Sequence, residues 1–266
     1  MQLNVYDTGL KANQKDATSL VFVHGVFHGS WCWQDNFIPY FEKLGYRCLA
    51  MDIRGHGKSE GKEQLNKYKM DDYVEDIRSV VEGLRGKVVV IGHSMGGVLV
   101  ERFIQNHQVY AAVLITPPPL EGASASFNRL SKNISRIDLL KFVLMKNPFV
   151  LVKNPKVSKL MFFTEEMSDE DYKVHYNRLG KESYAVIMEI LKPFIKGYLN
   201  PLKVPILLIG AYKDGFFTPD EINATADQYG VQPVFFEGGH DLMLETSWNK
   251  VAESIEKWLV TEASKH

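Results

Sequence analysis

The sequence has little cysteine, no long apolar run and no excess of charge of either sign. Its two cysteines, Cys32 and Cys48, are too few for a disulfide framework and do not form a CxxC metal motif. No apolar run reaches the length of a membrane span. The net charge of -1 at pH 7 lacks the basic excess of a nucleic-acid-binding surface. We therefore expect no nucleic-acid partner and a reduced, cytoplasmic location.

The first twenty residues also lack the charged start and apolar stretch of a secretory signal peptide. Internal repeats and low-complexity tracts are missing as well. What the chain does have is 266 residues with 45% hydrophobic composition, which is enough for one large core. We expect a soluble intracellular protein with one α/β domain and an insertion. The composition leaves the oligomeric state open.

Short apolar runs rich in β-branched residues recur along the chain, and most end in Gly, Asp or His. They occupy residues 19–25, 46–52, 87–93, 110–116, 204–210 and 231–239. Such runs indicate strands that are buried on both faces of a parallel sheet. Amphipathic segments alternate with them at residues 70–86, 96–107 and 247–266. The alternation predicts an α/β fold with a doubly wound, mostly parallel sheet, and residues 3–7 predict an antiparallel edge strand.

The alternation stops between residues 117 and 201, where helix-like stretches follow one another. These stretches lie at residues 125–147, 154–164, 168–180 and 181–199. The pattern predicts a core domain made of residues 1–116 and 202–266. Residues 117–201 are expected to form a helical lid over the carboxyl end of the sheet.

A serine stands where two buried segments meet, in the stretch "VIGHSMGGVLV" (90–100). Gly92, Ser94 and Gly96 form a G-x-S-x-G pattern between an expected strand and an expected helix. Glycines on both sides let the strand and the helix pass closely around a sharp turn, which exposes the hydroxyl at a helix N-terminus. The alternative, a serine that only caps the helix, does not need the flanking glycines. The pattern therefore predicts a catalytic nucleophile.

A serine nucleophile needs a general base and an acid that orients the base. His240 follows the last expected strand on a double-glycine loop, and Asp214 follows the strand before it. Because the carboxyl ends of parallel strands meet at one edge, we expect both side chains to converge with Ser94. Metal binding and helix capping are the alternatives for His240. Asp220 fits the start of a helix better, and the side chain of Asp241 is expected to point away from the neighbouring imidazole.

The negative charge that develops on a substrate carbonyl oxygen must meet two fixed backbone N–H donors. Met95, the residue after the serine, is expected to supply one of them. The loop "HGVFHGSWCW" (24–33), which follows the first parallel strand, is expected to supply the other. Val26 is the expected donor in that loop and Phe27 is the alternative. The ring of His24 is expected to hydrogen-bond loop carbonyls and fix the turn.

Five sequence blocks resemble those of the α/β-hydrolase fold family in order and spacing. They are "VHGVFHGSWCW", "MDIRGHGKSEG", "GHSMGG", "GAYKDGFFTP" and "GGHDLMLE", and they cover nearly all of the chain outside the insertion. The resemblance implies a serine nucleophile, an acid after a late strand and a terminal histidine. These positions fall on Ser94, Asp214 and His240. In the second block, His56 is expected to have a structural function in a turn.

Particular residues separate the activities found in this family. Haloalkane dehalogenases and epoxide hydrolases have an aspartate at the nucleophile position, where this chain has Ser94. The loop at 24–33 also resembles that of plant hydroxynitrile lyases and methyl-ester hydrolases. The lyases, however, have threonine in place of Gly25 and lysine in place of Asp241. Carbon–carbon hydrolases of ring-cleavage products usually have Ser-Gly-x-Gly-Pro in this loop, which "VFHGSW" does not match.

Basic and apolar side chains are interleaved in the first half of the insertion. Residues 129–159 contain eight Lys or Arg side chains and a single acid, Asp138. One interpretation is an acyl pocket with a cationic rim and weak contact with a membrane surface. The other is that the apolar side chains pack on the core and the lysines form a solvated face. The candidate pocket residues are Phe27, His28, Trp31, Trp33, Phe142, Met161, Phe162 and Phe216.

Together these features predict a serine hydrolase that cleaves carboxylic esters, with apolar or acyl-chain esters as the small-molecule substrates. No metal and no cofactor are implied. A carbon–carbon or amide hydrolase that uses the same triad is one alternative. A ligand-binding protein without catalysis is another, although such a protein has no use for an intact set of Ser94, Asp214 and His240.

Overall fold

One sheet runs through the middle of the molecule in the computed structural model, which describes residues 1–10, 18–193, 204–261 and 263. Within these residues the sheet has seven strands in the order β1-β3-β2-β4-β5-β6-β7. The strands are β1 (Val5–Asp7), β2 (Ser19–Val23), β3 (Arg47–Met51), β4 (Val88–His93), β5 (Ala111–Ile115), β6 (Ile206–Ala211) and β7 (Val234–Phe236). β1 pairs antiparallel with β3, and every other pair is parallel. The predicted α/β fold and the antiparallel edge strand are confirmed.

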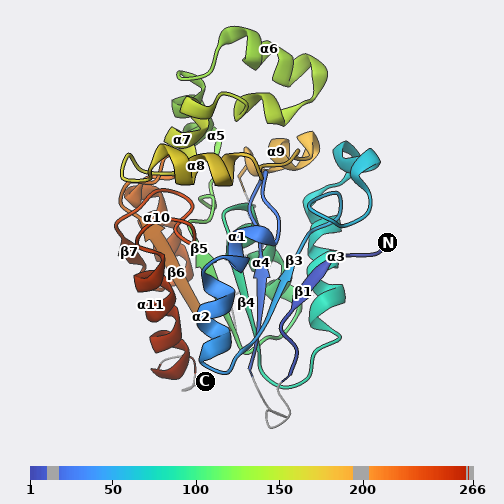
Figure 1. Cartoon of the computed structure of the whole chain (residues 1–266), viewed down its shortest axis with the longest axis vertical. Coiled ribbons are helices and arrows are strands. Elements are labelled where there is room, and N and C mark those ends of the chain that lie inside the picture. The colour runs from blue at the N-terminus through green and yellow to red at the C-terminus, as the bar shows by residue number, and fades with distance from the viewer. Residues whose placement is uncertain (11–17, 194–203, 262, 264–266) are drawn as a thin grey trace.

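Helices cover both faces of this sheet, as a doubly wound fold requires. Figure 1 shows α2 and α11 in front of the sheet, where they contact each other, while α3 and α4 pack together on the other side. The core helices are α1 (Trp31–Gln34), α2 (Phe37–Lys43), α3 (Met70–Val81), α4 (Met95–Asn106), α10 (Pro219–Tyr229) and α11 (Trp248–Thr261), with a 3-10 turn at η1 (Lys62–Lys67). Sequence analysis identified α3, α4 and α11 and did not place α1, α2 or η1.

The central strands are buried on both faces, which explains their near-continuous apolar sequences. Every residue of β2, β4, β5 and β6 is buried. The edge strand β1 is mostly exposed instead. Because side chains alternate between the faces of a strand, full burial requires covering layers on both sides. The sheet therefore offers solvent and ligands only its ends, and the loops at the carboxyl ends become the place for a site.

Between β5 and β6 the chain forms a group of helices above the carboxyl ends of the strands (Figure 1). This helical insertion contains α5 (Ser124–Ser131), α6 (Arg136–Met145), the 3-10 turn η2 (Pro148–Leu151), α7 (Pro155–Phe162), α8 (Asp169–Tyr176) and α9 (Tyr184–Ile190). The expected helix-like stretch 125–147 is divided at Ser135, whose hydroxyl accepts a hydrogen bond from the Asp138 N–H and starts a new helix. The predicted boundary between 201 and 202 lies outside the described residues.

Polar contacts join the second half of the insertion to the core. The carboxylate of Glu182 accepts hydrogen bonds from His56 (3.0 Å) and from the Tyr73 hydroxyl (3.1 Å). Ser183 donates to the Tyr68 carbonyl at 2.8 Å.

No helix in the described ranges is both long and apolar enough to cross a membrane.

At two positions of the turn between β4 and α4, the packing leaves no space for a side chain larger than the hydrogen atom of glycine. A Cβ atom on Gly92 would lie 2.2 Å from the Gly96 carbonyl oxygen, and one on Gly96 would lie 2.3 Å from the Val23 carbonyl oxygen. Both contacts are with backbone atoms, which have little freedom to move. The glycines of the G-x-S-x-G pattern therefore allow α4 to start directly against β2 and β4.

We predict that Gly96→Ala lowers the free energy of unfolding by at least about 2 kcal/mol, because the added methyl group overpacks a rigid backbone contact. Urea unfolding measures this change. The control is Gly83→Ala, where the nearest atom to the new Cβ would be 3.6 Å away. It should change stability by no more than about 0.5 kcal/mol. Equal stability of the two variants would contradict the tight-packing interpretation.

Candidate active site

Ser94 lies on the sharp turn between β4 and α4 and has an unusual backbone conformation. Its φ and ψ are 52° and -121°, outside the regions that L residues normally occupy. The Ser94 N–H donates to the Ile115 carbonyl at 2.9 Å, which holds the turn against β5. The side chain lines a cleft under the helical insertion. Strain of this kind is maintained by the surrounding structure and is typical of functional positions.

His240 and Asp214 come from two different loops and meet as a hydrogen-bonded pair. The Nδ1 atom of His240 lies 3.0 and 2.9 Å from the two carboxylate oxygens of Asp214. The Asp214 carboxylate also accepts hydrogen bonds from the N–H groups of Phe216 and Phe217. Because Nδ1 is held by an acceptor, it carries the ring proton. The other ring nitrogen, Nε2, is buried and has no hydrogen-bond partner among the described residues.

The backbone of His240 is also fixed from two sides. Its carbonyl oxygen accepts hydrogen bonds from the Thr116 hydroxyl (3.0 Å) and from Nε2 of His93 (3.1 Å). Thr116 has a φ of 44°, which is rare for a β-branched residue. One oxygen of Glu245 accepts from the N–H groups of Gly239 (3.0 Å) and Thr164 (2.6 Å). The histidine loop is therefore tied to β4, to the end of β5 and to the insertion.

Backbone N–H groups are available next to the serine. Among the described residues, the N–H groups of Val26 and Met95 donate no hydrogen bond to another protein group. Met95 is the first residue of α4, where N–H groups point out of the helix. Val26 lines the same cleft as Ser94. Phe27, the alternative donor, has a φ of 66°, and its carbonyl accepts from the Gly180 N–H at 2.7 Å.

The cleft beside Ser94 contains about 650 Å³ of empty space, part of it open to solvent, and is almost wholly apolar. Its polar side chains are only those of Ser94 and Ser126, and no Lys or Arg lines it in the described part of the chain. Most of its walls belong to the insertion. These residues are Pro118, Ala123, Ser126, Phe127, Leu130, Ile134, Leu151, Val152, Met161, Ile187, Ile190 and Leu191. The cationic rim, one of the two interpretations of the basic residues, is therefore not part of the cleft wall in the described residues, and Lys153 forms an ion pair with Asp138.

Only some of the candidate pocket residues line this cleft. Phe27, Met161 and Phe216 do. The remaining five are packed elsewhere because their rings fill the space between elements. Trp33 packs on Phe22 and Phe37 in the core, Phe142 packs on Phe127 and Tyr184 inside the insertion, and Phe162 lies between His28 and Phe216. Trp31 stacks on His28, and the His28 side chain is only 1% exposed.

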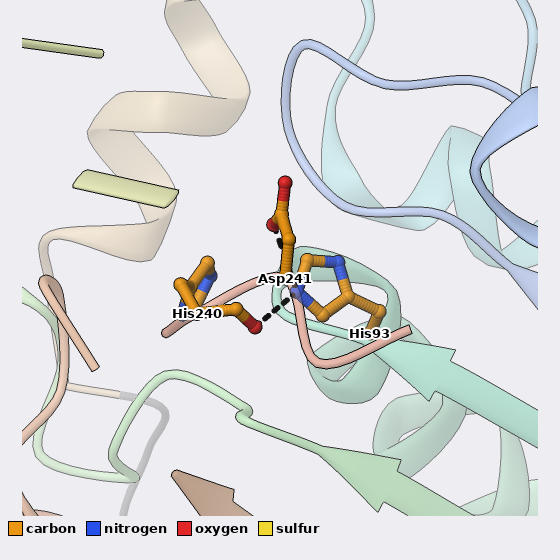
Figure 2. A group of neighbouring side chains, drawn as sticks. All are labelled: His93, His240 and Asp241. Atoms are coloured by element: carbon orange, nitrogen blue, oxygen red, sulfur yellow. Dashed lines mark hydrogen bonds and ion pairs between the residues drawn. The ribbon is translucent and has the colours of Figure 1, made fainter. Parts of the chain in front are cut away.

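Figure 2 shows three titratable side chains near one another: His93, His240 and Asp241. One possible ligand atom from each lies within 4.8 Å of the others, which is the spacing of a metal site. Nδ1 of His93, Nε2 of His240 and Oδ1 of Asp241 have no hydrogen-bond partner among the described residues, whereas the other ring nitrogens are engaged. Nε2 of His93 donates to the His240 carbonyl, and Nδ1 of His240 pairs with Asp214. Nδ1 of His93 faces backbone, since a Cβ on Gly25 would lie 2.8 Å from it. A metal ion bound through Nε2 of His93 or Nδ1 of His240 would have to displace the hydrogen bonds to the His240 carbonyl and to Asp214.

Two further buried histidines, His24 and His56, have pKa values shifted in opposite directions. Burial lowers the pKa of His24 to about 4, so this ring is neutral. Its Nδ1 donates to the Gly25 carbonyl, and its Nε2 accepts from the Ile53 N–H, which fixes the loop as expected. His56 lies between the Arg54 carbonyl and the Glu182 carboxylate. Burial opposes charge on His56, but Glu182 outweighs that effect and raises its pKa.

Asp241 was expected to point away from the imidazole of His240, and it bonds instead to a distant loop. Its Oδ2 lies 2.9 Å from Nε2 of His28, and both side chains are almost completely buried. Its other carboxylate oxygen lies 3.4 Å from Nε2 of His93. Sequence reasoning missed this pair, as it missed Thr116 and Glu245. Glu245 is the last residue of the block "GGHDLMLE". Its position shortly after His240 was the only feature of the sequence that could have pointed to it.

Comparison with known proteins identifies a family and several relatives, some of which match only part of the chain. Residues 20–254 match the model of the alpha/beta hydrolase family. A bifunctional esterase/perhydrolase from Acinetobacter calcoaceticus is 31% identical over 232 residues, which cover 79% of this chain and 78% of that protein. Epoxide hydrolase 1 from Caenorhabditis elegans is 29% identical over 99 residues, or 37% of this chain. That match spans only 24% of the length of the epoxide hydrolase.

Solved structures show the same fold at low sequence identity. An esterase from Exiguobacterium antarcticum superposes with a TM-score of 0.74 over 97% of this chain and 96% of that chain, at 19% identity. At this identity the likeness establishes the architecture and leaves chemistry to the residues of the cleft.

We predict that Glu245→Ala lowers the free energy of unfolding by about 2–4 kcal/mol, because the buried N–H groups of Thr164 and Gly239 lose their acceptor. Chemical denaturation tests this value. The control is Glu253→Ala on the exposed face of α11, for which we expect a change below about 0.5 kcal/mol. A Glu245→Ala protein as stable as this control would show that Glu245 does not hold the loop.

Proposed function

The chain belongs to the alpha/beta hydrolase family, and we propose that it hydrolyses carboxylic esters with apolar groups through Ser94, His240 and Asp214. The observation that carries the proposal is a strained serine in the cleft together with the His240–Asp214 pair, whose imidazole ring lies 4.5 Å from the ring of Phe216 in the wall of the same cleft. The unpaired Nε2 of His240 supports it further. Catalytic hydrogen bonds are often long in unliganded sites and shorten when substrate binds.

The proposed reaction begins when Ser94 Oγ attacks the ester carbonyl carbon while Nε2 of His240 takes the hydroxyl proton. Asp214 holds the opposite ring nitrogen and stabilises the imidazolium that forms. The N–H groups of Met95 and Val26 stabilise the negative oxygen of the tetrahedral intermediate. The alcohol leaves with the proton from His240. Water then attacks the acyl-enzyme in the same way, releasing the acid and restoring Ser94.

The apolar cleft supports esters with a hydrophobic acyl or alcohol group. Its walls contain no charged side chain among the described residues, so a charged substituent would lose hydration without gaining a partner. An alkyl chain would gain roughly 0.8 kcal/mol for each buried methylene. We also propose that residues 117–201 act as a lid, since their described part supplies most of these walls.

We infer that helix α6 makes the weak contact with anionic membrane surfaces. Five of its large apolar side chains are 55–70% exposed, namely Ile137, Leu140, Val143, Leu144 and Met145. Arg136 and Lys141 on the helix are exposed as well. An exposed helix with apolar and basic side chains suits the boundary between lipid headgroups and acyl chains. Figure 1 shows α6 at the end of the molecule, away from the sheet.

A cytoplasmic location is part of the proposal. Cys32 and Cys48 are buried and unpaired, which suits a reducing compartment. A small-molecule ester is the expected partner of the cleft.

We predict that Ser94→Ala lowers kcat for p-nitrophenyl esters by on the order of a millionfold and abolishes labelling by a fluorophosphonate, because the attacking oxygen is lost. The wild type should prefer longer acyl chains in a series from acetate to laurate. Ser79→Ala on α3 serves as the control and should react like the wild type. Full activity of the Ser94 variant would contradict the proposal. If the wild type hydrolyses amides and not esters, amides are the substrate class.

We predict that replacing both Leu140 and Leu144 by Asp weakens binding to vesicles of phosphatidylcholine and phosphatidylglycerol by at least about tenfold. Each substitution removes apolar area and adds a charge repelled by the lipid. Co-sedimentation measures the binding. Leu44→Asp, at an exposed apolar position on the core, is the control and should bind like the wild type. Equal binding of all three proteins, or none by the wild type, would exclude α6 as the contact.

A further inference from the structure

We propose that His28 and Asp241 form a buried charged pair that positions the Val26 loop against the loop of His240. This inference rests on the ester hydrolysis proposed above. Neither side chain lines the cleft. Both would therefore act as positioning residues, through the backbone groups and rings of their neighbours.

The contacts of the His28 ring require both of its nitrogens to donate. Nδ1 lies 2.7 Å from the Val26 carbonyl oxygen, and Nε2 lies 2.9 Å from Oδ2 of Asp241. A carbonyl oxygen only accepts, and so does the ionised carboxylate that the lowered pKa of Asp241 favours, whereas a neutral imidazole has one N–H. The ring is therefore an imidazolium that faces an ionised carboxylate. Both side chains are 1% exposed or less, so water does not screen this pair.

The two ends of the pair belong to the two loops that the proposed reaction must align. The Val26 carbonyl belongs to the peptide that carries the Phe27 N–H, and Val26 itself carries the expected oxyanion donor, so the hydrogen bond with His28 restrains the backbone on the carboxyl side of that donor. Asp241 directly follows His240, and its own N–H donates to the Phe162 carbonyl at 2.9 Å. The ion pair thus links two residues that are 213 positions apart in the sequence. His28 lies in the loop of the proposed oxyanion donor, and Asp241 follows the proposed general base.

The surroundings of the pair decide its protonation. Burial opposes charge on His28, but Asp241 outweighs that effect and raises the pKa of His28 above its usual 6.5. Burial likewise opposes charge on Asp241, and His28 outweighs it, so the pKa of this carboxyl falls. The other titratable groups facing His28 are His93 on β4, His175 on α8 and Glu182 in the insertion. Trp31 stacks on the ring and Phe162 meets it edge-on.

The sign of the pH effect follows from these shifts. Because the pKa of His28 is raised, its contribution to the charged pair is fully present below pH 6.5 and is lost as pH rises through the raised value. Because the pKa of Asp241 is lowered, the pair persists on the acid side until pH falls through the lowered value. A deprotonated His28 would place a ring lone pair against either the Val26 carbonyl or the carboxylate, and the bond to one of the two loops would be lost.

Two substitutions separate the geometry of the pair from its charge. His28→Gln keeps a donor for Asp241 and loses the bond to the Val26 carbonyl. Asp241→Asn keeps the shape and removes the charge, so a neutral His28 can donate to Val26 and accept from the new amide. We expect His28→Gln to lower kcat by about tenfold or more, with KM nearly unchanged, because the loops lose their alignment. Asp241→Asn should stay within about threefold of the wild type at neutral pH and lose the alkaline fall in kcat.

The chain offers a matched control in the buried pair formed by His56 and Glu182. It has the same chemistry, with one ring nitrogen on a backbone carbonyl (3.1 Å) and the other on a carboxylate (3.0 Å). It joins the insertion to the core and does not contact the loop of His240. His56→Gln should therefore lower the unfolding temperature about as much as His28→Gln does and leave kcat within about twofold of the wild type.

The outcomes distinguish this inference from the proposed ester hydrolysis. If the two Gln variants lose the same amount of kcat, or none, the pair has no positioning function and the inference is wrong. If the wild type neither turns over esters nor reacts with a fluorophosphonate, the proposed function fails first. The ring nitrogen chemical shifts of His28 then still test the pair. Two protonated nitrogens at pH 7 in the wild type and one in Asp241→Asn support it, and a single protonated nitrogen in both overturns it.

Discussion

The close contact between the turn at Ser94 and strand β2 is the constraint on which the rest of the site depends. Gly92 and Gly96 leave no space for a side chain, so the chain reverses from β4 into α4 within one residue of unusual conformation. That reversal places an oxygen above the sheet and Met95 at the first turn of a helix. The loops of His240 and Val26 are held by their own hydrogen bonds and lie around this turn.

The strands were predictable, and the three side chains of the proposed triad could be suggested, because their signals in the sequence are local. Apolar runs revealed the buried strands, and residues after strand ends suggested Ser94, Asp214 and His240, of which His240 and Asp214 form a hydrogen-bonded pair. Helices α1 and α2 were harder to find because they are short and follow a loop rich in aromatic residues. The pocket was predicted poorly for another reason: an aromatic residue near a site can face the ligand or the core, and periodicity does not distinguish them. Trp33 and Phe27 show both outcomes a few residues apart.

Long-range polar contacts could not be read from the sequence at all. The bonds from Asp241 to His28 and from Glu182 to His56 join residues 213 and 126 positions apart. No spacing rule links such residues, and each looks unremarkable in its own segment. In the fold they are nevertheless among the few charged groups that are completely enclosed, where an unpaired charge would be strongly destabilising. These pairs therefore identify the loops whose separation would leave a buried charge without its partner.

The walls of the cleft come mainly from one continuous stretch of chain, while the groups of the proposed triad come from three loops of the sheet. This division means that the stretch between β5 and β6 can accumulate substitutions that reshape the space for a ligand without disturbing the reversal at Ser94 or the loop of His240. A protein built this way can acquire a new preference through ordinary drift in a single segment. Exchange of that segment between relatives would carry the preference with it.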